Sequence, residues 1–140
     1  MRGLVHRVSS ASVSVAGERV AAIGPGLLVL VGVARGDGEE TADRLARRLS
    51  GLRIFDGADG RMNRSVADTG GEVLCVSQFT LLGELHSGTR PSFTAAAPAE
   101  LAEPLYERVR AALGAQGGRF GARMAVELVN DGPVTLLVEA

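Results

Sequence analysis

Apolar and polar residues alternate through the first part of the chain, at the period of two that is typical of strands with one buried face. The alternation runs through residues 4–9 and 11–16, which predicts a pair of strands, and a third strand is expected over residues 18–23. After the turn marked by Gly24-Pro25-Gly26, residues 27–33 are apolar at almost every position. This second pattern predicts a strand that is buried on both faces.

Two later segments show the period of a helix. In the first, Asp37 is expected to cap the N-terminus, with Glu40 three residues later as in a capping box. In the second, Pro98 is expected to open the helix. The apolar positions at helical spacing are Ala42, Leu45, Ala46, Leu49 and Leu52 in the first segment and Leu101, Leu105, Val109 and Ala112 in the second.

Three further strands are expected over residues 72–79, 122–129 and 134–139. The order of strands, helix, strands, helix, strands is typical of an α+β domain, and we expect layered mixed β-sheets covered by two helices. A chain of 140 residues has the size of one domain, so residues 1–140 are expected to share one fold.

Composition excludes a disordered chain, because 46% of the residues are hydrophobic. The longest apolar run, residues 26–34, is shorter than the roughly 20 residues of a membrane span, so no membrane partner is expected. No secretory signal is visible, and a single cysteine, Cys75, excludes an internal disulfide. We therefore expect a cytoplasmic protein.

The formal net charge of −1 argues against a protein that coats nucleic acid, although a local contact with a nucleic-acid end stays open. Arg44, Arg47 and Arg48 share the polar face of the first predicted helix. A solvated face is the simpler interpretation of these arginines, and a weak patch for phosphates is the alternative.

Few residues are suited to catalysis. His6 and His86 are the only histidines, so a His-rich zinc site is excluded and neither a metal nor a cofactor is expected. Cys75 lies in the middle of a predicted strand, which favours a core position over a nucleophile. His6 is expected to be structural, although a triad formed in space by either histidine and a hydroxyl stays open.

Two polar segments remain as candidates for a functional site. The first, Ser77-Gln78-Phe79-Thr80-Leu81, ends a buried strand and offers hydroxyls, an amide and backbone N–H groups, a set that can stabilise an oxyanion. Its alternative interpretation is a polar strand exit. The second is Asn130-Asp131-Gly132-Pro133-Val134-Thr135. From composition alone it is an ordinary hairpin turn with a trans proline bond.

Together these segments resemble the two signature motifs of the D-aminoacyl-tRNA deacylases, also called D-tyrosyl-tRNA deacylases. The resemblance covers almost the whole chain, because further fragments fall in the order of that family. These fragments are Arg7-Val8, Ala11-Ser12-Val13, Gly26-Leu27-Leu28-Val29-Leu30, Arg53-Ile54-Phe55, Met62-Asn63, Arg90-Pro91-Ser92-Phe93 and Gly118-Arg119-Phe120.

The resemblance implies a homodimer with active sites at the subunit interface. Such an enzyme hydrolyses the ester between a D-amino acid and the 3′-terminal adenosine of tRNA, and it also removes glycine from mischarged tRNA. The Gly132-Pro133 bond would be cis and would enter the partner's pocket, leaving room for hydrogen but not for an L side chain. Arg7 is implied as the support of this peptide. The apolar strand from Leu27 also favours a dimer.

The expected catalytic residues are Ser77, Gln78, Phe79 and Thr80, with backbone N–H groups near Phe79 and Thr80 as oxyanion donors. No base is visible beside Thr80, so positioning of substrate is favoured over a covalent role, with water or the ribose hydroxyl taking part in the attack. Candidates for holding the adenosine are Met62, Asn63 and Phe93. Two other functions stay open: a module that binds the RNA end without turnover, and a generic esterase.

Overall fold

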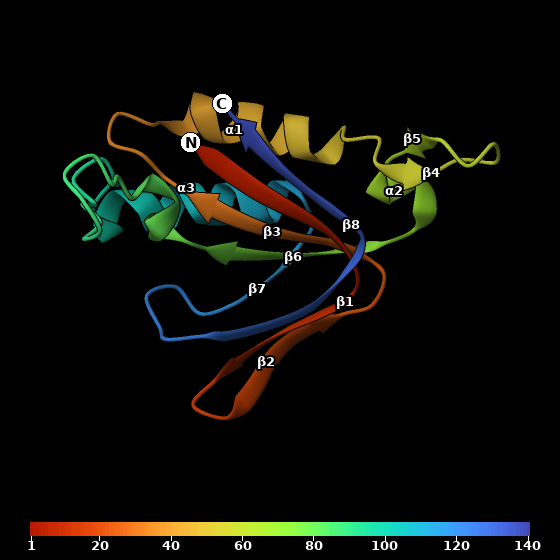
Figure 1. The fold of residues 1–140 in the computed structure, drawn as a ribbon, viewed down its shortest axis with the longest axis horizontal. Helices are drawn as coiled ribbons and strands as arrows, with labels where there is room; N and C mark the ends of the chain where they lie inside the picture. Colours follow the sequence, from red (N-terminus) through yellow and green to blue (C-terminus); the bar gives the residue numbers. More distant parts are fainter.

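The strands form one curved, mixed sheet and a small separate hairpin (Figure 1). The computed structural model describes residues 1–140. Six strands form the main sheet in the order β2-β1-β3-β6-β7, with β8 paired to β1, and β4 and β5 form the hairpin. The strands are β1 (Arg2–Val15), β2 (Glu18–Ile23), β3 (Gly26–Gly32), β4 (Phe55–Asp56), β5 (Met62–Arg64), β6 (Glu72–Ser77), β7 (Gln116–Gly117) and β8 (Ala125–Glu139).

Two long helices, α1 (Glu39–Ser50) and α3 (Ala99–Ala112), pack together on one face of this sheet. Figure 1 shows α1 above β3 and β6, while β1 and β8 run from beside α1 down toward β2, which lies lowest. A short helix, α2 (Val66–Thr69), and a 3-10 turn, η1 (Phe79–Leu82), complete the chain. The predicted α+β architecture, with two helices covering mixed strands, is confirmed. No helix is long and apolar enough to cross a membrane.

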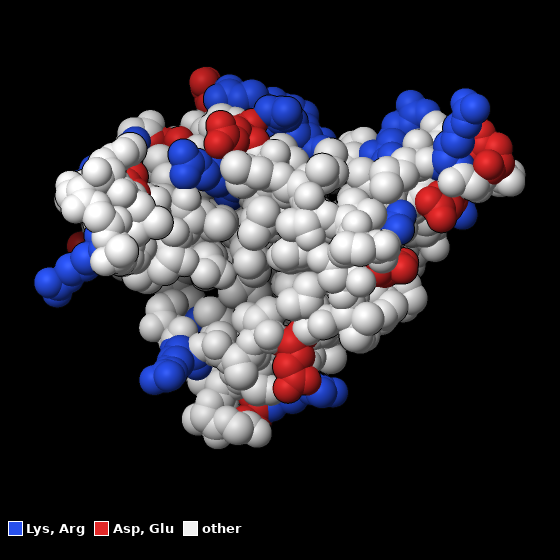
Figure 2. Space-filling model, in the orientation of Figure 1, with Lys and Arg blue, Asp and Glu red and all other residues white.

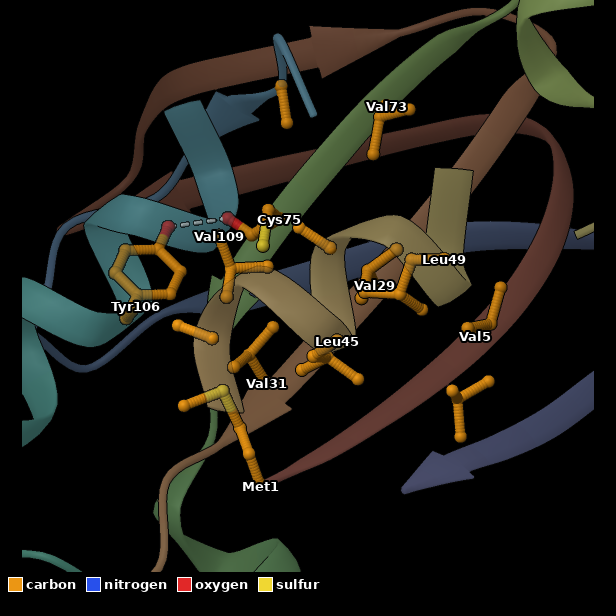
Figure 3. Packing of buried hydrophobic residues seen from close by; sticks show 14 of the residues in the cluster. Met1, Val5, Val29, Val31, Leu45, Leu49, Val73, Cys75, Tyr106 and Val109 are labelled. Carbon is orange, nitrogen blue, oxygen red and sulfur yellow. Dashed lines mark hydrogen bonds between the residues drawn. The ribbon is translucent and has the colours of Figure 1, made fainter. Parts of the chain in front are cut away.

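The main core lies between these two helices and the sheet (Figure 3). Leu45 and Leu49 of α1 and Val109 of α3 are fully buried among the side chains of β1, β3 and β6. Cys75 is part of this core, and burial raises the pKa of its thiol to about 12, so the reactive thiolate is suppressed. The prediction that Cys75 is a core residue is confirmed. A smaller core lies on the other face of the sheet, where its curvature brings Val13 and Ile23 over Leu28.

The predicted helices exist, but two details of them are wrong. Helix α1 begins at Glu39 with Gly38 as its cap, and not at Asp37; the Asp37 carboxylate instead accepts a hydrogen bond of 2.7 Å from the Ala34 N–H in the preceding turn. Helix α3 buries Tyr106, whereas two residues of its predicted apolar stripe, Leu101 (61% exposed) and Ala112, are exposed. The reason is that the Tyr106 hydroxyl donates a 2.6 Å hydrogen bond to the carbonyl of Cys75, which fixes the rotation of the helix (Figure 3).

The bounds of two predicted strand regions also differ from the prediction. Residues 4–9 and 11–16 belong to one strand, β1, which pairs with β3 in its first half and with β2 in its second. The turn from β1 into β2 is formed by Ala16 and Gly17, which both have positive φ as in the favoured two-residue turns. Strand β6 ends at Ser77 instead of residue 79, because Phe79 begins η1.

The C-terminal segments are likewise one strand, β8, and not two strands joined by a hairpin. Both halves of β8 pair with β1: Asn130 lies opposite Val8, and Thr135 lies opposite His6. Between these pairs, β1 contributes one residue and β8 contributes four. Residues 131–134 therefore form a bulge that projects from a continuous ladder, and the expectation of an ordinary hairpin turn is wrong.

Candidate active site

A pocket of about 440 Å³ opens where β6 ends, and it contains the first polar motif. Three segments form its walls: the end of β6 with η1, the residues around the start of α3, and the loop that leads into β8. The lining residues are Val33, Val76, Ser77, Gln78, Phe79, Thr80, Ala97, Ala99, Ala102, Phe120, Gly121, Ala122, Met124 and Val126. Thus the structure brings the four expected catalytic residues together in one concave site.

The local backbone explains why these four residues face the pocket. The Gln78 N–H donates to the carbonyl of Val31 at 2.8 Å, which ties the chain to β3 at the last step of the parallel ladder. The chain then turns into η1, whose first residues are Phe79 and Thr80. The first N–H groups of a helical turn have no acceptor inside that turn, so both remain available to a bound oxyanion.

The chemistry of the pocket is neutral. None of its lining residues is ionisable. The Gln78 side-chain amide donates a 2.7 Å hydrogen bond to Thr80 Oγ1, which withdraws electron density from the oxygen that would attack. A hydroxyl without a neighbouring base is a weak nucleophile, so the geometry favours a positioning role for Thr80.

Phe79 and Phe93 form an aromatic pair at the rim of the pocket. Their ring centroids are 5.0 Å apart at an interplanar angle of 72°, an edge-to-face arrangement. The Phe79 side chain is 56% exposed, whereas Phe93 is half-buried behind it. Phe93 is thus placed to support Phe79, and it is not among the residues that line the pocket.

The apolar wall of the pocket is the part that sequence reasoning missed. Phe120 contributes to this wall while its ring packs against Tyr106, with centroids 6.1 Å apart. Ala102 and Met124 face the same space from α3 and from the loop before β8. The available sequence signal is weak: a short alternation of polar and apolar residues over 119–124, which includes Phe120, one of only four phenylalanines.

The second polar motif lies away from this pocket within the chain. Arg7, which contacts the Gly132 region, is opposite Leu27 in the ladder between β1 and β3, whereas Ser77 is opposite Val31. Four residues of β3 separate these positions, which corresponds to roughly 13 Å along the strand. In Figure 1 the bend of β8 and the arrowhead of β6 accordingly lie toward opposite ends of the sheet.

Arg7 holds the Gly132 bulge from one side. Its buried guanidinium donates to the carbonyls of Asp131 at 3.1 Å and Ile54 at 2.7 Å. Gly132 has φ +128°, and a Cβ there would lie 3.0 Å from Arg7 Nη2 and 2.8 Å from a methyl of Val134. The position therefore requires glycine for both conformation and space. The Gly132-Pro133 peptide bond is cis.

A polar cluster holds the bulge from the other side. His6 Nδ1 lies 2.9 Å from Thr135 Oγ1, and the Asn130 amide donates to the same oxygen at 2.8 Å. The Val134 N–H in turn donates to Asn130 Oδ1 at 2.9 Å. Burial lowers the pKa of His6, which favours the neutral imidazole. His6 is thus a structural residue of the bulge, in agreement with the prediction.

Met62 and Asn63 lie on the β4–β5 hairpin and not in the pocket of their own chain. Both are exposed, and the Arg53 guanidinium donates to the Asn63 carbonyl at 3.0 Å. The hairpin is on the side of the molecule where Arg7 contacts Ile54 and, at 3.6 Å, the Asp56 carboxylate. Met62 and Asn63 therefore lie on the same side of the chain as the Gly132 bulge.

Comparison with known proteins identifies the family. The sequence matches the D-Tyr-tRNA(Tyr) deacylase family over residues 4–139. It is 54% identical to a D-aminoacyl-tRNA deacylase of Symbiobacterium thermophilum, over 100% of this chain and 96% of that protein.

Two solved structures share the fold. One, named c-Myc DNA Unwinding Element Binding Protein, superimposes with a TM-score of 0.92 at 40% identity, covering 100% of this chain and 99% of the other. A second, described as a probable eukaryotic D-amino acid tRNA deacylase, has a TM-score of 0.80 at 19% identity over 99% and 98% of the two chains, and it bears on the fold alone. With both signature motifs intact and the match extending over nearly every residue, the chain belongs to the D-Tyr-tRNA(Tyr) deacylase family.

Proposed function

We propose that this protein hydrolyses the ester of D-aminoacyl-tRNA, and removes glycine from mischarged tRNA, in a site shared by two copies of the chain. One observation carries the proposal. The pocket with Ser77 to Thr80 and the Gly132 bulge lie far apart within one chain, yet each is rigidly held and open to its surroundings. Two chains related by a two-fold axis can bring each bulge to the other chain's pocket.

Strand β8 supports this dimer. It pairs only with β1, so its other edge is unpaired, and it carries four exposed large apolar side chains: Leu128, Val129, Leu136 and Leu137. An exposed apolar edge strand normally needs a partner. The apolar strand from Leu27, which favoured a dimer in the sequence, is buried within the chain as β3 and makes no contribution. Sedimentation should give about twice 14.5 kDa.

The proposed reaction needs little machinery, because an aminoacyl ester is already activated. Water attacks the carbonyl carbon, the ribose hydroxyl beside the ester assists by passing the proton of the water to the leaving ribose oxygen, and the N–H groups of Phe79 and Thr80 stabilise the oxyanion. The tetrahedral intermediate then collapses with cleavage of the bond to the ribose oxygen. That oxygen leaves as a hydroxyl of the terminal adenosine, taking up the proton lost by the attacking group, and the amino acid is released as a free acid.

Selectivity for chirality is assigned to the partner's bulge. Its backbone would face the α-carbon of the substrate, where hydrogen fits and an L side chain clashes. Glycine has no side chain to exclude, so it would be accepted. The apolar wall with Ala102, Phe120 and Met124 fits the adenine ring, and Met62 and Asn63 would reach the same site together with the partner's Gly132 bulge.

The test is deacylation of matched D-tyrosyl-, L-tyrosyl- and glycyl-tRNA by the purified protein. We expect release of D-tyrosine and glycine, with L-tyrosyl-tRNA left intact. Equal rates on the D and L substrates would refute the assignment of chirality. Binding of charged tRNA without release would support an RNA-end-binding module, and turnover of small esters without tRNA would support a generic esterase.

Since charged tRNA is used in translation, we expect the protein to act in the cytoplasm.

A further inference from the structure

The loop that leads into β8 presents two arginines beside the mouth of the pocket. Arg119 and Arg123 are exposed, whereas Phe120, Ala122 and Met124 between and after them are half-buried and line the pocket. Successive side chains in this loop thus alternate between the pocket and the solvent, as they do in a strand. A ligand whose end fills the pocket must pass this loop or one of the other two walls.

The outward position of the two arginines is fixed by the packing of their neighbours. Phe120 is anchored against Tyr106, and Met124 fits so closely over Gly118 that a Cβ there would lie 2.5 Å from the Met124 sulfur. Between these anchors, the Ala122 N–H donates to the Arg119 carbonyl at 3.1 Å in a turn that Gly121 completes with φ +76°. The loop therefore holds both guanidinium groups on the solvent side.

Neither arginine has a partner within the protein. Arg108 and Arg110 of α3 form ion pairs with Asp43 and Glu107, whereas Arg119 and Arg123 form no ion pair and no side-chain hydrogen bond. The opposite wall has the other sign of charge, because Glu100 and Glu103 are exposed on α3 next to the pocket residues Ala99 and Ala102. Figure 2 shows a hollow toward the left of the molecule, with basic side chains below its left end.

We infer that Arg119 and Arg123 form a binding site for the backbone phosphates of the RNA strand whose terminal adenosine occupies the pocket. The acidic residues of α3 repel that strand and the arginines attract it, so the acceptor end leaves the pocket over the loop before β8. This assignment rests on the proposed function, because it takes the pocket as the site of the terminal nucleotide. It adds the direction of the RNA and two residues that recognise it.

The test compares a long and a short substrate. Arg119→Gln, Arg123→Gln and the double variant are assayed with D-tyrosyl-tRNA and with D-tyrosyl-adenosine, which has the ester but no further phosphates. We expect KM for the tRNA to rise up to about 5-fold for each substitution, with kcat unchanged. KM for the adenosine ester should not change. The slope of log kcat/KM against log salt should decrease by about 0.7 for each arginine removed.

Arg44→Gln is the matched control, since Arg44 is an exposed arginine without an ion pair on α1, away from the pocket. An unchanged KM and salt slope in the double variant would overturn the inference. So would an equal rise in KM for the adenosine ester, which would indicate a deformed loop, or the same effect in the control. Binding of uncharged tRNA, measured by fluorescence anisotropy, separates the two proposals: a weaker affinity in the double variant supports the phosphate site even if no D-aminoacyl ester is hydrolysed.

Discussion

Arg7 offers the most direct test of how the Gly132 bulge is held. Replacing it by methionine keeps most of the apolar stem and removes the guanidinium. Two carbonyls then lose their donor, those of Ile54 and Asp131, at 2.7 and 3.1 Å. Hydrogen bonds to a charged group are each worth about 1.5–3 kcal/mol, and part of this is retained where water replaces the guanidinium.

The ion pairs of Arg7 add little to this sum. The Asp56 and Asp131 side chains lie 3.6 and 3.7 Å away and are 65% and 60% exposed, so each pair contributes on the order of 0–1 kcal/mol. We therefore expect Arg7→Met to lower the free energy of unfolding by roughly 2–4 kcal/mol. Arg7→Lys keeps the charge but can reach only one of the two carbonyls, so it should lose about half as much.

The measurement is urea denaturation at a fixed protein concentration, because a dimer gains stability with concentration. Arg44→Met, at an exposed arginine on α1, is the control and should remain within about 0.5 kcal/mol of the wild type. Deacylation adds a functional readout: a released bulge should admit L-tyrosyl-tRNA, so the ratio of D to L rates should fall. A methionine variant with wild-type stability and an unchanged ratio would refute the reasoning.

Three further predictions concern Thr80, Tyr106 and His6. Thr80→Ala should lose about 10-fold in rate yet keep measurable turnover, and mass spectrometry of quenched reactions should detect no acyl-enzyme in the wild type; an acyl adduct on Thr80 would reverse the assignment. Tyr106→Phe removes the donor to the Cys75 carbonyl and should lower the free energy of unfolding by about 1–2 kcal/mol in urea denaturation, and an unchanged value would contradict this role. Because burial lowers the pKa of His6 from its ordinary 6.5, the folded state binds the proton less well than the unfolded state, so stability is full above pH 6.5 and falls as the pH drops toward the folded pKa. Thermal unfolding should show less of this acid loss in His6→Gln, and equal slopes for both proteins would exclude His6 as its source.

Much of the fold was accessible from the sequence because periodicity reports which face of an element is buried. The apolar residues 27–33 predicted a central strand, and β3 is buried between β1 and β6. The spacing of Leu45 and Leu49 predicted the buried face of α1. Both signature motifs could also be recognised, since their residues are contiguous in the chain, and the match to the family confirms that resemblance.

The partners of each element were decided only by the tertiary structure. Periodicity does not tell which strand lies alongside another, so the sequence pattern predicts two strands in place of β1 and a hairpin in place of the Gly132 bulge. The ladder between β1 and β8 shows that each is one continuous strand. The rotation of α3 depends on one distant acceptor, the Cys75 carbonyl. The apolar wall of the pocket joins β6, α3 and the loop before β8, which are far apart in sequence. A strand's own sequence encodes its burial, whereas a pocket and a register arise from the packing of several segments at once.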